Sequence, residues 1–169
     1  REMMDAVRRE ISGVLERGKI PVMLGGEHSI AIGAIQAMKE ARPGISVLHL
    51  DAHADMRESY QGTPFSHACV ARRISETAPI VQVGIRSMSA EEASWLREQG
   101  RSVIRPGDLR GTSGWLERIS RQLTEDVYLT VDLDVLDPSV MPATGTPEPD
   151  GLTWAELLTV VREIAKRHV

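Results

Sequence analysis

Short apolar runs that alternate with helical patterns constrain the fold of this chain more than any other feature. The segments between these runs carry apolar side chains at helical spacing, as Met4, Val7 and Ile11 do. Strands that alternate with helices predict a parallel sheet with helices on both faces. The sequence therefore predicts a three-layer α/β/α fold. The strand-like runs cover residues 21–24, 45–50, 80–85, 102–104 and 126–131.

The helix predictions rest on the same periodicity and on local start signals. Ser89 with Glu92, and Thr153 with Glu156, each form the sequence pattern of a capping box at a helix start. No linker, repeat or low-complexity segment interrupts the 169 residues, so we expect a single domain over 1–169. The predicted helices cover residues 2–17, 29–41, 68–75, 89–99, 115–123 and 153–168.

Composition excludes several classes of partner. The formal net charge is −4 and the Lys and Arg residues are scattered, which argues against nucleic acid or an anionic membrane. No apolar run approaches the roughly 18 residues that span a bilayer, and no secretory signal is visible. The lone Cys69 excludes an internal disulfide. We therefore expect a soluble, cytoplasmic protein.

Polar side chains follow three of the predicted strands. Ligands of parallel α/β sheets bind outside the carboxyl ends of the strands. A single Asp after a strand is usually a turn former or a helix cap. Here two clusters occur, with small residues between the polar ones, and this pattern favours ligand binding instead. In an extended chain, alternate residues of each cluster would share one side. The candidate ligands are His28, Asp51, His53, Asp55, Asp132 and Asp134.

Four converging carboxylates require a cation. Like charges a few Å apart disfavour their shared ionisation, and carboxylates drawn from water lose hydration. Carboxylates with imidazoles and no thiolate favour hard ions such as manganese over structural zinc. Six ligands exceed the need of one tetrahedral ion, whereas two ions about 3.5 to 4 Å apart would use them all.

Three sequence runs together carry a resemblance to a known family. They are GGEHS at residues 25–29, DAHAD at 51–55, and DLDVLDP at 132–138 continuing to TGTP at 144–147. In order and context these runs resemble the ureohydrolase family of arginases and agmatinases over most of the chain. The resemblance implies an arginase-like fold and a binuclear manganese site. It implies that His28 and Asp55 bind one ion, that His53 and Asp134 bind the other, and that Asp51 and Asp132 bridge them.

The resemblance also implies catalytic roles. Asp134 would orient the attacking hydroxide in addition to binding metal. His67, within residues 66–68, resembles the histidine proposed to protonate the departing amine, and an imidazole titrates in a suitable range. Without the family context, a lone histidine in a loop would be interpreted as a solvated or capping residue.

The substrate prediction rests on two stretches of sequence. TPEP at residues 146–149 and the loop from Asp51 to His67 resemble agmatinases more than arginases. We therefore expect hydrolysis of agmatine to putrescine and urea, with an arginase or another guanidino-acid ureohydrolase as the alternative. Glu148 is a candidate substrate-side carboxylate, or equally a plain loop residue. Asp150 stands where the family commonly has Gly.

Other features depart from the family pattern. The resemblance implies a Glu-Val-x-Pro motif beyond the last helix, and this sequence has no counterpart of it. The chain begins with Arg1, and a helix is predicted to run almost to Val169. We expect a partial sequence with a sheet incomplete at both ends, whose activity alone is uncertain. The family commonly forms trimers or hexamers.

Two other classes stay open. One is a metal-binding relative without turnover. The other is a one-zinc amidohydrolase on a deacetylase-like fold, which the number of Asp residues disfavours. Among the remaining residues, we expect His49 to be a core histidine rather than one supporting the metal ligands. We expect Trp95, Trp115 and Trp154 to pack in their helices.

Overall fold

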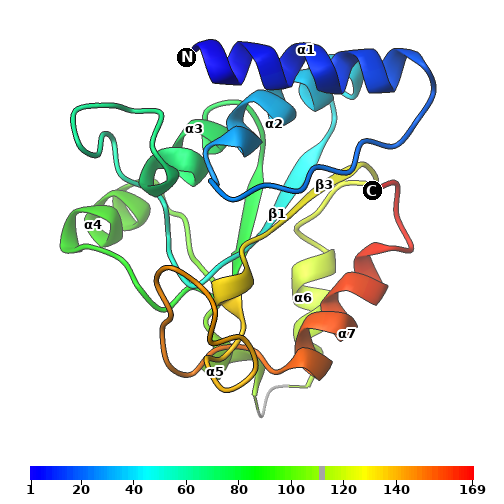
Figure 1. Ribbon diagram of the computed structural model, residues 1–169. Coiled ribbons are helices and arrows are strands. Elements are labelled where there is room, and N and C mark those ends of the chain that lie inside the picture. The colour runs from blue at the N-terminus through cyan, green and yellow to red at the C-terminus, as the bar shows by residue number, and fades with distance from the viewer. Residues whose placement is uncertain (111–112) are drawn as a thin grey trace.

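A computed structural model describes residues 1–110 and 113–169 and shows a sheet flanked by helices (Figure 1). The strands are β1 (Ser46–Leu50), β2 (Ile80–Val83) and β3 (Val127–Val131). Two short 3-10 helices, η1 (His67–Cys69) and η2 (Leu133–Val135), follow a loop and β3 respectively. The helices are α1 (Glu2–Glu16), α2 (Ile30–Ala41), α3 (Val70–Ser75), α4 (Ala90–Glu98), α5 (Pro106–Leu109), α6 (Trp115–Ser120) and α7 (Trp154–Ile164).

All three strands are parallel, in the order β2-β1-β3, with β1 at the centre. Leu50 at the end of β1 pairs with Val83 on one side and with Val131 on the other. The carboxyl ends of the strands therefore meet at one edge of the sheet, where each polar cluster begins.

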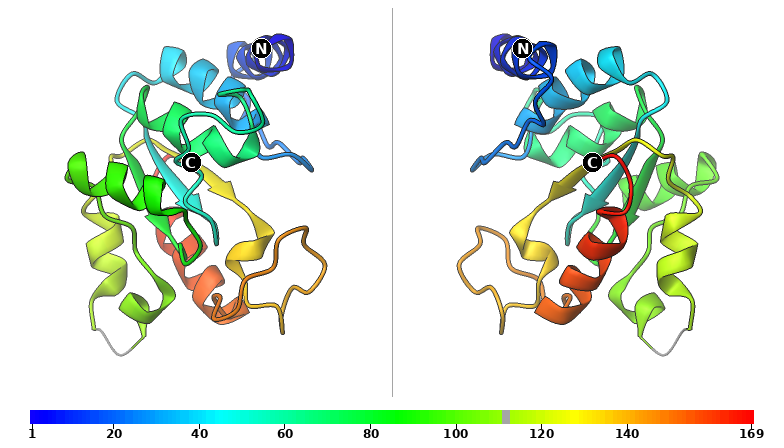
Figure 2. Two further views of the ribbon diagram at one scale, coloured as in Figure 1. Left: turned by 90° about the vertical axis from the view of Figure 1, so that its left-hand side faces the viewer. Right: turned by 90° about the vertical axis from the view of Figure 1, so that its right-hand side faces the viewer.

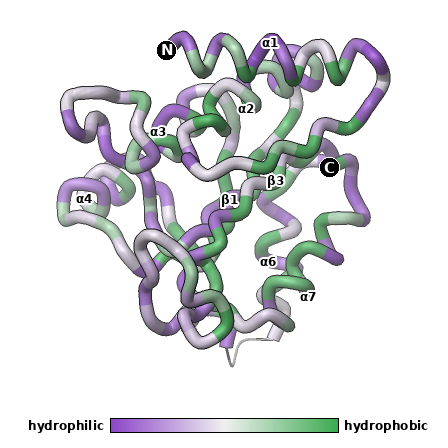
Figure 3. The backbone as a smooth tube through the Cα atoms, in the orientation of Figure 1, coloured by the Kyte–Doolittle hydropathy of each residue, from purple (hydrophilic) through white to green (hydrophobic). Residues whose placement is uncertain are grey.

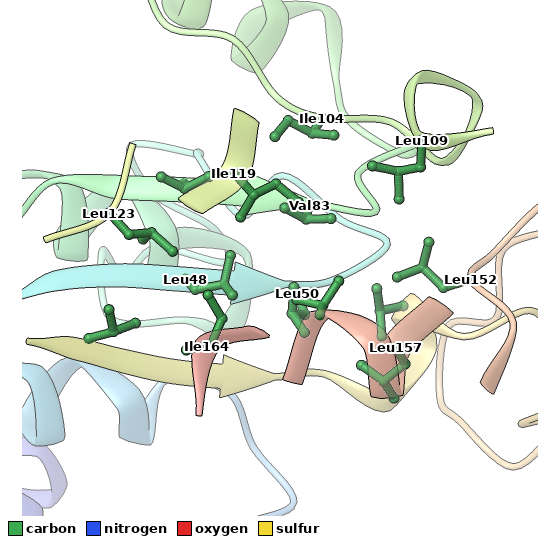
Figure 4. Close-up of a cluster of buried hydrophobic side chains, with 14 of the residues drawn as sticks. Leu48, Leu50, Val83, Ile104, Leu109, Ile119, Leu123, Leu152, Leu157 and Ile164 are labelled. Carbon is green, nitrogen blue, oxygen red and sulfur yellow. The ribbon is translucent and has the colours of Figure 1, made fainter. Parts of the chain in front are cut away.

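Alternate strand residues build separate cores on the two faces of the sheet. Leu48 and Leu50 point toward α6 and α7, and Figure 4 shows them packed against Ile164 and Leu157. Val47 lies on the opposite face, in a cluster with residues of α2 and α3. Figure 2 shows helices on both sides of the sheet. The predicted three-layer parallel α/β architecture is confirmed.

Helix α1 covers α2 rather than the sheet. Met4 and Ile11 are its buried residues, and α1 alternates between hydrophobic and hydrophilic colour along its length (Figure 3). Gly33 of α2 allows this contact, because a Cβ there would collide with the backbone of Met4. None of the helices in the described part of the chain is long and apolar enough to cross a membrane.

The strand predicted at residues 21–24 is wrong. This segment has no strand structure, and Ile20, Val22 and Leu24 are 74%, 82% and 93% exposed. The segment between α1 and α2 projects from the body of the molecule in Figure 2. An apolar run becomes a strand only where a neighbouring strand satisfies its backbone, and no described residue pairs with this one.

Several smaller expectations also fail. The strand at residues 102–104 is reduced to one bridge between Ile104 and Val83. The last helix ends at Ile164 and not at residue 168. The backbone carbonyl of His168 instead accepts a hydrogen bond from the backbone N–H of Val127, at 2.8 Å. Trp154 is 53% exposed because it stands at the first turn of α7, beyond the packed face.

Candidate metal centre

Two strand ends and the start of α2 bring the predicted ligands to one edge of the sheet. Asp51 follows β1 and Asp132 follows β3, whereas His28 lies just before the N-cap residue of α2, and not after a strand as predicted. Gly84, after β2, has a φ of +95°. A side chain at Gly84 would collide with Val135 and with the backbone of Asp51, so only glycine allows the approach that forms this edge.

Tight turns, rather than extended chain, aim the two clusters. Asp51 accepts a hydrogen bond from the backbone N–H of His53 at 2.7 Å, and Asp132 accepts one from the N–H of Asp134 at 3.2 Å. Asp55 adopts a φ of +51°. The expectation of alternation along a strand was therefore wrong, because an Asp side chain that bonds to the backbone two residues on forms a turn.

The first set of ligands, which we name the inner group, comprises His28, Asp51 and Asp55. Nδ1 of His28 lies 3.1 Å from Oδ2 of Asp51 and 3.5 Å from Oδ2 of Asp55. It also lies 3.4 Å from Oδ2 of Asp132. Nε2 of His28 is 3.0 Å from the hydroxyl of Thr130, which orients the ring so that Nδ1 faces the carboxylates.

The second set, which we name the outer group, comprises Asp51, His53 and Asp134. Nδ1 of His53 lies 3.1 Å from Oδ2 of Asp134 and 3.5 Å from Oδ1 of Asp51. Asp134 is held by the backbone N–H of Ala52 at 3.1 Å and by the hydroxyl of Thr146 at 3.2 Å. Asp51 is common to both groups and offers one oxygen to each.

The electrostatics of the cluster favour a cation. Burial raises the pKa of Asp55 well above its usual value, and the charge of Asp51 raises it further. Burial also raises the pKa of Asp134. Burial alone would lower the pKa of His28, but Asp132 and Asp51 outweigh it and raise that pKa to about 10. The clustered carboxylates therefore stabilise a positive charge placed among them, whether on a histidine or on a metal ion.

The contact with Asp134, and then that with Asp51, raises the pKa of His53 to about 10. Burial alone would raise the pKa of Asp51, but its three histidine neighbours hold it well below its usual range. Asp132 also has a lowered pKa, because its contact with His28 outweighs its burial. Asp51 and Asp132, the two carboxylates implied as bridges, thus favour ionisation.

Unsatisfied buried atoms mark the place that metal ions would occupy. Across the described residues, Nδ1 of His28, Nε2 of His49 and Oδ2 of Asp51 are buried and have no hydrogen-bond partner. Ligand atoms of His28, His49, Asp51 and Asp55 lie within 4.8 Å of one another, as do those of the outer group. Imidazole nitrogens and carboxylate oxygens suit divalent ions, so the residues present fit metal binding.

Arg86 is a supporting residue that the sequence analysis missed. Its guanidinium donates hydrogen bonds to the carbonyls of Asp134 at 2.7 Å, Glu148 at 2.8 Å, Pro149 at 2.8 Å and Gly84 at 3.0 Å. It therefore joins the end of β2 to the turn that carries Asp134 and to the loop after it. A signal existed, because Arg86 directly follows the predicted strand at 80–85, as the ligands follow theirs.

The two remaining candidates lie further from the carboxylates. An open cleft of about 1080 Å³ is lined by His67 and by residues of both ligand groups. The His67 side chain is 58% exposed, and its backbone N–H donates to Glu27 at 3.1 Å. Glu148 places Oε1 at 3.7 Å from Nε2 of His53. Neither the metal roles nor these two roles are tested by the geometry, and they remain predictions.

The loop around Asp150 keeps the conformation that glycine favours. Asp150 has a φ of +62°, in the left-handed region, and its carboxylate pairs with Arg110. An Asp tolerates this backbone region better than most residues. The departure from the family pattern at this position therefore leaves the left-handed turn in place.

The fold and the site together define a class: a parallel α/β protein with histidine and aspartate ligands for divalent ions at the carboxyl edge of its sheet. Comparison with known proteins narrows this class. The Arginase family model matches residues 1–169, and the chain belongs to this family.

Individual proteins and a solved structure resemble the chain over almost its whole length. The chain is 38% identical to an N(1)-aminopropylagmatine ureohydrolase of Synechocystis over 165 residues, 96% of this chain and 54% of the relative. It is 36% identical to an agmatinase of Bacillus subtilis over 169 residues, 98% of this chain and 57% of the relative. The crystal structure of agmatine ureohydrolase of Thermoplasma volcanium superposes with a TM-score of 0.90 at 36% identity, over 99% of this chain and 58% of that one. The chain thus spans little more than half the length of these relatives.

Proposed function

We propose that the protein is a binuclear manganese ureohydrolase that releases urea from agmatine and leaves putrescine. The observation that carries this proposal is the convergence of two ligand groups on a shared, buried Asp51, with unsatisfied atoms facing each other. Membership of the Arginase family supports hydrolysis of a guanidino group. Residues 1–169 would then belong to one catalytic domain.

The metal assignments follow the resemblance to the family, and the inner and outer groups support those of His28, Asp51, His53, Asp55 and Asp134. We assign His28 and Asp55 to one ion, His53 and Asp134 to the other, and Asp51 and Asp132 to both. When bound, two divalent ions would neutralise the carboxylates and lower the pKa of a coordinated water, which supplies a nucleophile at neutral pH. Manganese is proposed because the ligands are hard oxygens and imidazoles without thiolate.

The remaining roles belong to the side chains around the cluster. A guanidinium carbon is a weak electrophile, so Asp134 would orient the attacking oxygen by accepting its proton in a hydrogen bond. When the C–N bond breaks, its electron pair goes to the departing nitrogen, and His67 would supply the proton that this nitrogen takes. Glu148, whose partly exposed carboxylate lies beside the outer group, would face a cationic group of the substrate.

Agmatine leads over arginine for two reasons. The relatives are named for agmatine or its aminopropyl derivative. An arginase must also hold an α-carboxylate and an α-amine, and we identify no residue set for them. N(1)-aminopropylagmatine is a second candidate substrate, because the Synechocystis relative that acts under this name is 38% identical.

The test uses the full natural protein loaded with manganese. Urea release should be faster from agmatine than from arginine, with N(1)-aminopropylagmatine assayed beside them. Faster release from arginine would overturn the agmatinase assignment, and faster release from the aminopropyl compound would select the second candidate. Two bound ions with no urea from any guanidino compound would identify a non-catalytic metal-binding relative.

Three further proposals concern the protein as a whole. We propose that it acts in the cytoplasm, supported by the lone, fully buried thiol of Cys69. We propose a role in polyamine metabolism, supported by the names of the relatives. We propose a homo-oligomer, a trimer or hexamer, as the resemblance to the family implies. Light scattering on the full natural protein would measure the mass of the assembly.

A further inference from the structure

His49 is a buried imidazole that the proposed reaction leaves without a role. It lies in the central strand β1 and is fully buried. Its ring stacks on that of His28, with centroids 5.0 Å apart and an interplanar angle of 21°. In the sheet register, His49 stands between Gln82 of β2 and Thr130 of β3. These three side chains therefore form a polar row across the sheet beside the inner group.

Gln82 fixes the tautomer of His49. The side-chain nitrogen of Gln82 donates to the carbonyl of Ala54 at 2.7 Å, which identifies this end of the amide as the NH₂ group. The same nitrogen lies 3.1 Å from Nδ1 of His49. Nδ1 must therefore act as an acceptor, and in a neutral ring the proton is then on Nε2.

A proton on Nε2 of His49 would face the carboxylate of Asp51. Nε2 of His49 is buried and lies 3.2 Å from Oδ2 of Asp51, an oxygen that also lies 3.1 Å from Nδ1 of His28. The other oxygen of Asp51 accepts the backbone N–H of His53. A donor on each side would fix the plane of the carboxylate that the two ligand groups share.

The alternative role for His49 is direct metal ligation. Its Nε2 is close enough to the inner group to serve, within 4.8 Å of the other ligand atoms. A metal ligand must offer a free lone pair at Nε2. The contact with Gln82 instead keeps Nδ1 as the unprotonated acceptor and leaves the proton on Nε2. The Gln82 amide therefore disfavours ligation and favours hydrogen bonding to Asp51.

We propose that His49 is a positioning residue for the metal centre: locked by Gln82 with its proton on Nε2, it holds Asp51 so that each carboxylate oxygen faces one ligand group. This inference rests on the proposed metal site, and its tests measure the tautomer and the metal affinity rather than turnover. Partners that orient a metal ligand typically change affinity by 10- to 100-fold when removed.

The first test reads the tautomer directly. Long-range ¹H–¹⁵N NMR of the full natural protein, metal-free and loaded with diamagnetic Zn²⁺, should show His49 protonated at Nε2 and unprotonated at Nδ1 in both states. A proton on Nδ1 in the metal-free protein would refute the role of Gln82, and loss of the Nε2 proton when Zn²⁺ binds would show instead that His49 is a ligand.

The second test separates the donor from the shape of the ring. A His49→Gln variant can place an amide N–H where Nε2 stands, whereas His49→Leu cannot. We expect His49→Leu to weaken manganese binding by about 10- to 100-fold, and His49→Gln to recover most of that loss. The matched control is His168→Leu, at a histidine whose side chain is 70% exposed.

Each outcome of the second test decides the proposal. If His49→Leu binds manganese as the unmodified protein does, or if His49→Gln loses as much as His49→Leu, the positioning role is wrong. Should His49→Leu fail to fold, Gln82→Met replaces it, with a mixed tautomer and weaker binding expected. Failure of the unmodified protein to bind manganese would instead overturn the proposed function.

Discussion

The inner and outer ligand groups share Asp51 but differ in how they are built. His28 and Asp55 have side chains 9% exposed, enclosed by α2 and the sheet. In the outer group, the side chain of His53 is 25% exposed, whereas that of Asp134 is 5% exposed and accepts a hydrogen bond from Thr146. Electrostatic attraction is stronger where water is excluded. Because His53 is more exposed than His28, we expect the outer group to exchange its proposed ion first.

The largest expected effect is that of removing the residue common to both groups. In Asp51→Asn the inner and outer groups each lose a charged oxygen. We expect loss of both ions and a fall in urea production of roughly a thousandfold or more. Metal analysis and a urea assay on the full natural protein would measure this. The matched control is Asp5→Asn, at an exposed residue of α1. Two ions retained in Asp51→Asn would show that Asp51 is not a shared ligand.

The two histidine ligands separate the groups from each other. Removal of metal by a chelator should proceed in two phases, the faster from the outer group. We expect His53→Asn to abolish the fast phase and His28→Asn to abolish the slow phase, each with an activity loss of roughly a hundredfold. Metal release followed with a chromogenic chelator would measure both. A single phase in the unmodified protein, or the reverse assignment, would break the comparison.

His67 lines the cleft without a described contact to either group. Removing a general acid lowers turnover without removing metal, so His67→Asn should reduce the turnover number by about 10- to 100-fold with two ions still bound. Parallel turnover and metal measurements make this check. Loss of metal would identify His67 as a ligand, and unchanged turnover would show that it does not supply the proton.

Arg86 affects only the outer group in this account. Lysine at position 86 keeps the charge but lacks the planar fork that reaches several carbonyls. We expect Arg86→Lys to lower the free energy of unfolding of the metal-free protein by about 2 kcal/mol and to weaken the outer ion by about tenfold. Urea denaturation and metal titration would measure these changes, with Arg121→Lys, 80% exposed, as the control. Equal weakening of both ions would contradict the distinction between the groups.

The smallest expected effect concerns the loop that supports the outer group. Ser139 and the backbone N–H of Gly151 donate to Asp137 and lower its pKa from 3.8 to about 2. Because the folded-state pKa is depressed, this anchoring is complete above pH 3.8 and is lost as the pH falls through about 2. Amide exchange over residues 137–151 should show acid loosening that Asp137→Asn abolishes. Identical pH dependence in this variant would refute the anchor.

The sequence predicted the elements that have packing partners among the described residues. The apolar run of β1 and the helical spacing in α1, α2 and α7 each place apolar side chains where other elements cover them. Residues 21–24 have an equally apolar composition, but no strand in the described part of the chain pairs with them. Strand formation depends on a neighbour as well as on the segment itself, and local composition does not report the neighbour.

The sequence predicted which residues gather at the candidate site better than it predicted the residues that support them. The clusters that begin at Asp51 and Asp132 follow strand ends, which apolar runs locate, whereas His28 lies just before α2 and follows no strand. Thr130 and Gln82 meet His28 and His49 only because the strand order is β2-β1-β3 in this register. That order is a tertiary property, so no local spacing in the sequence predicts these contacts.

The most direct measurement is anomalous X-ray scattering from crystals of the full natural protein grown with manganese. We predict two peaks on either side of Asp51, about 3.5 to 4 Å apart, one bounded by His28 and Asp55 and the other by His53 and Asp134. A single peak, or peaks away from these five residues, would contradict a binuclear centre.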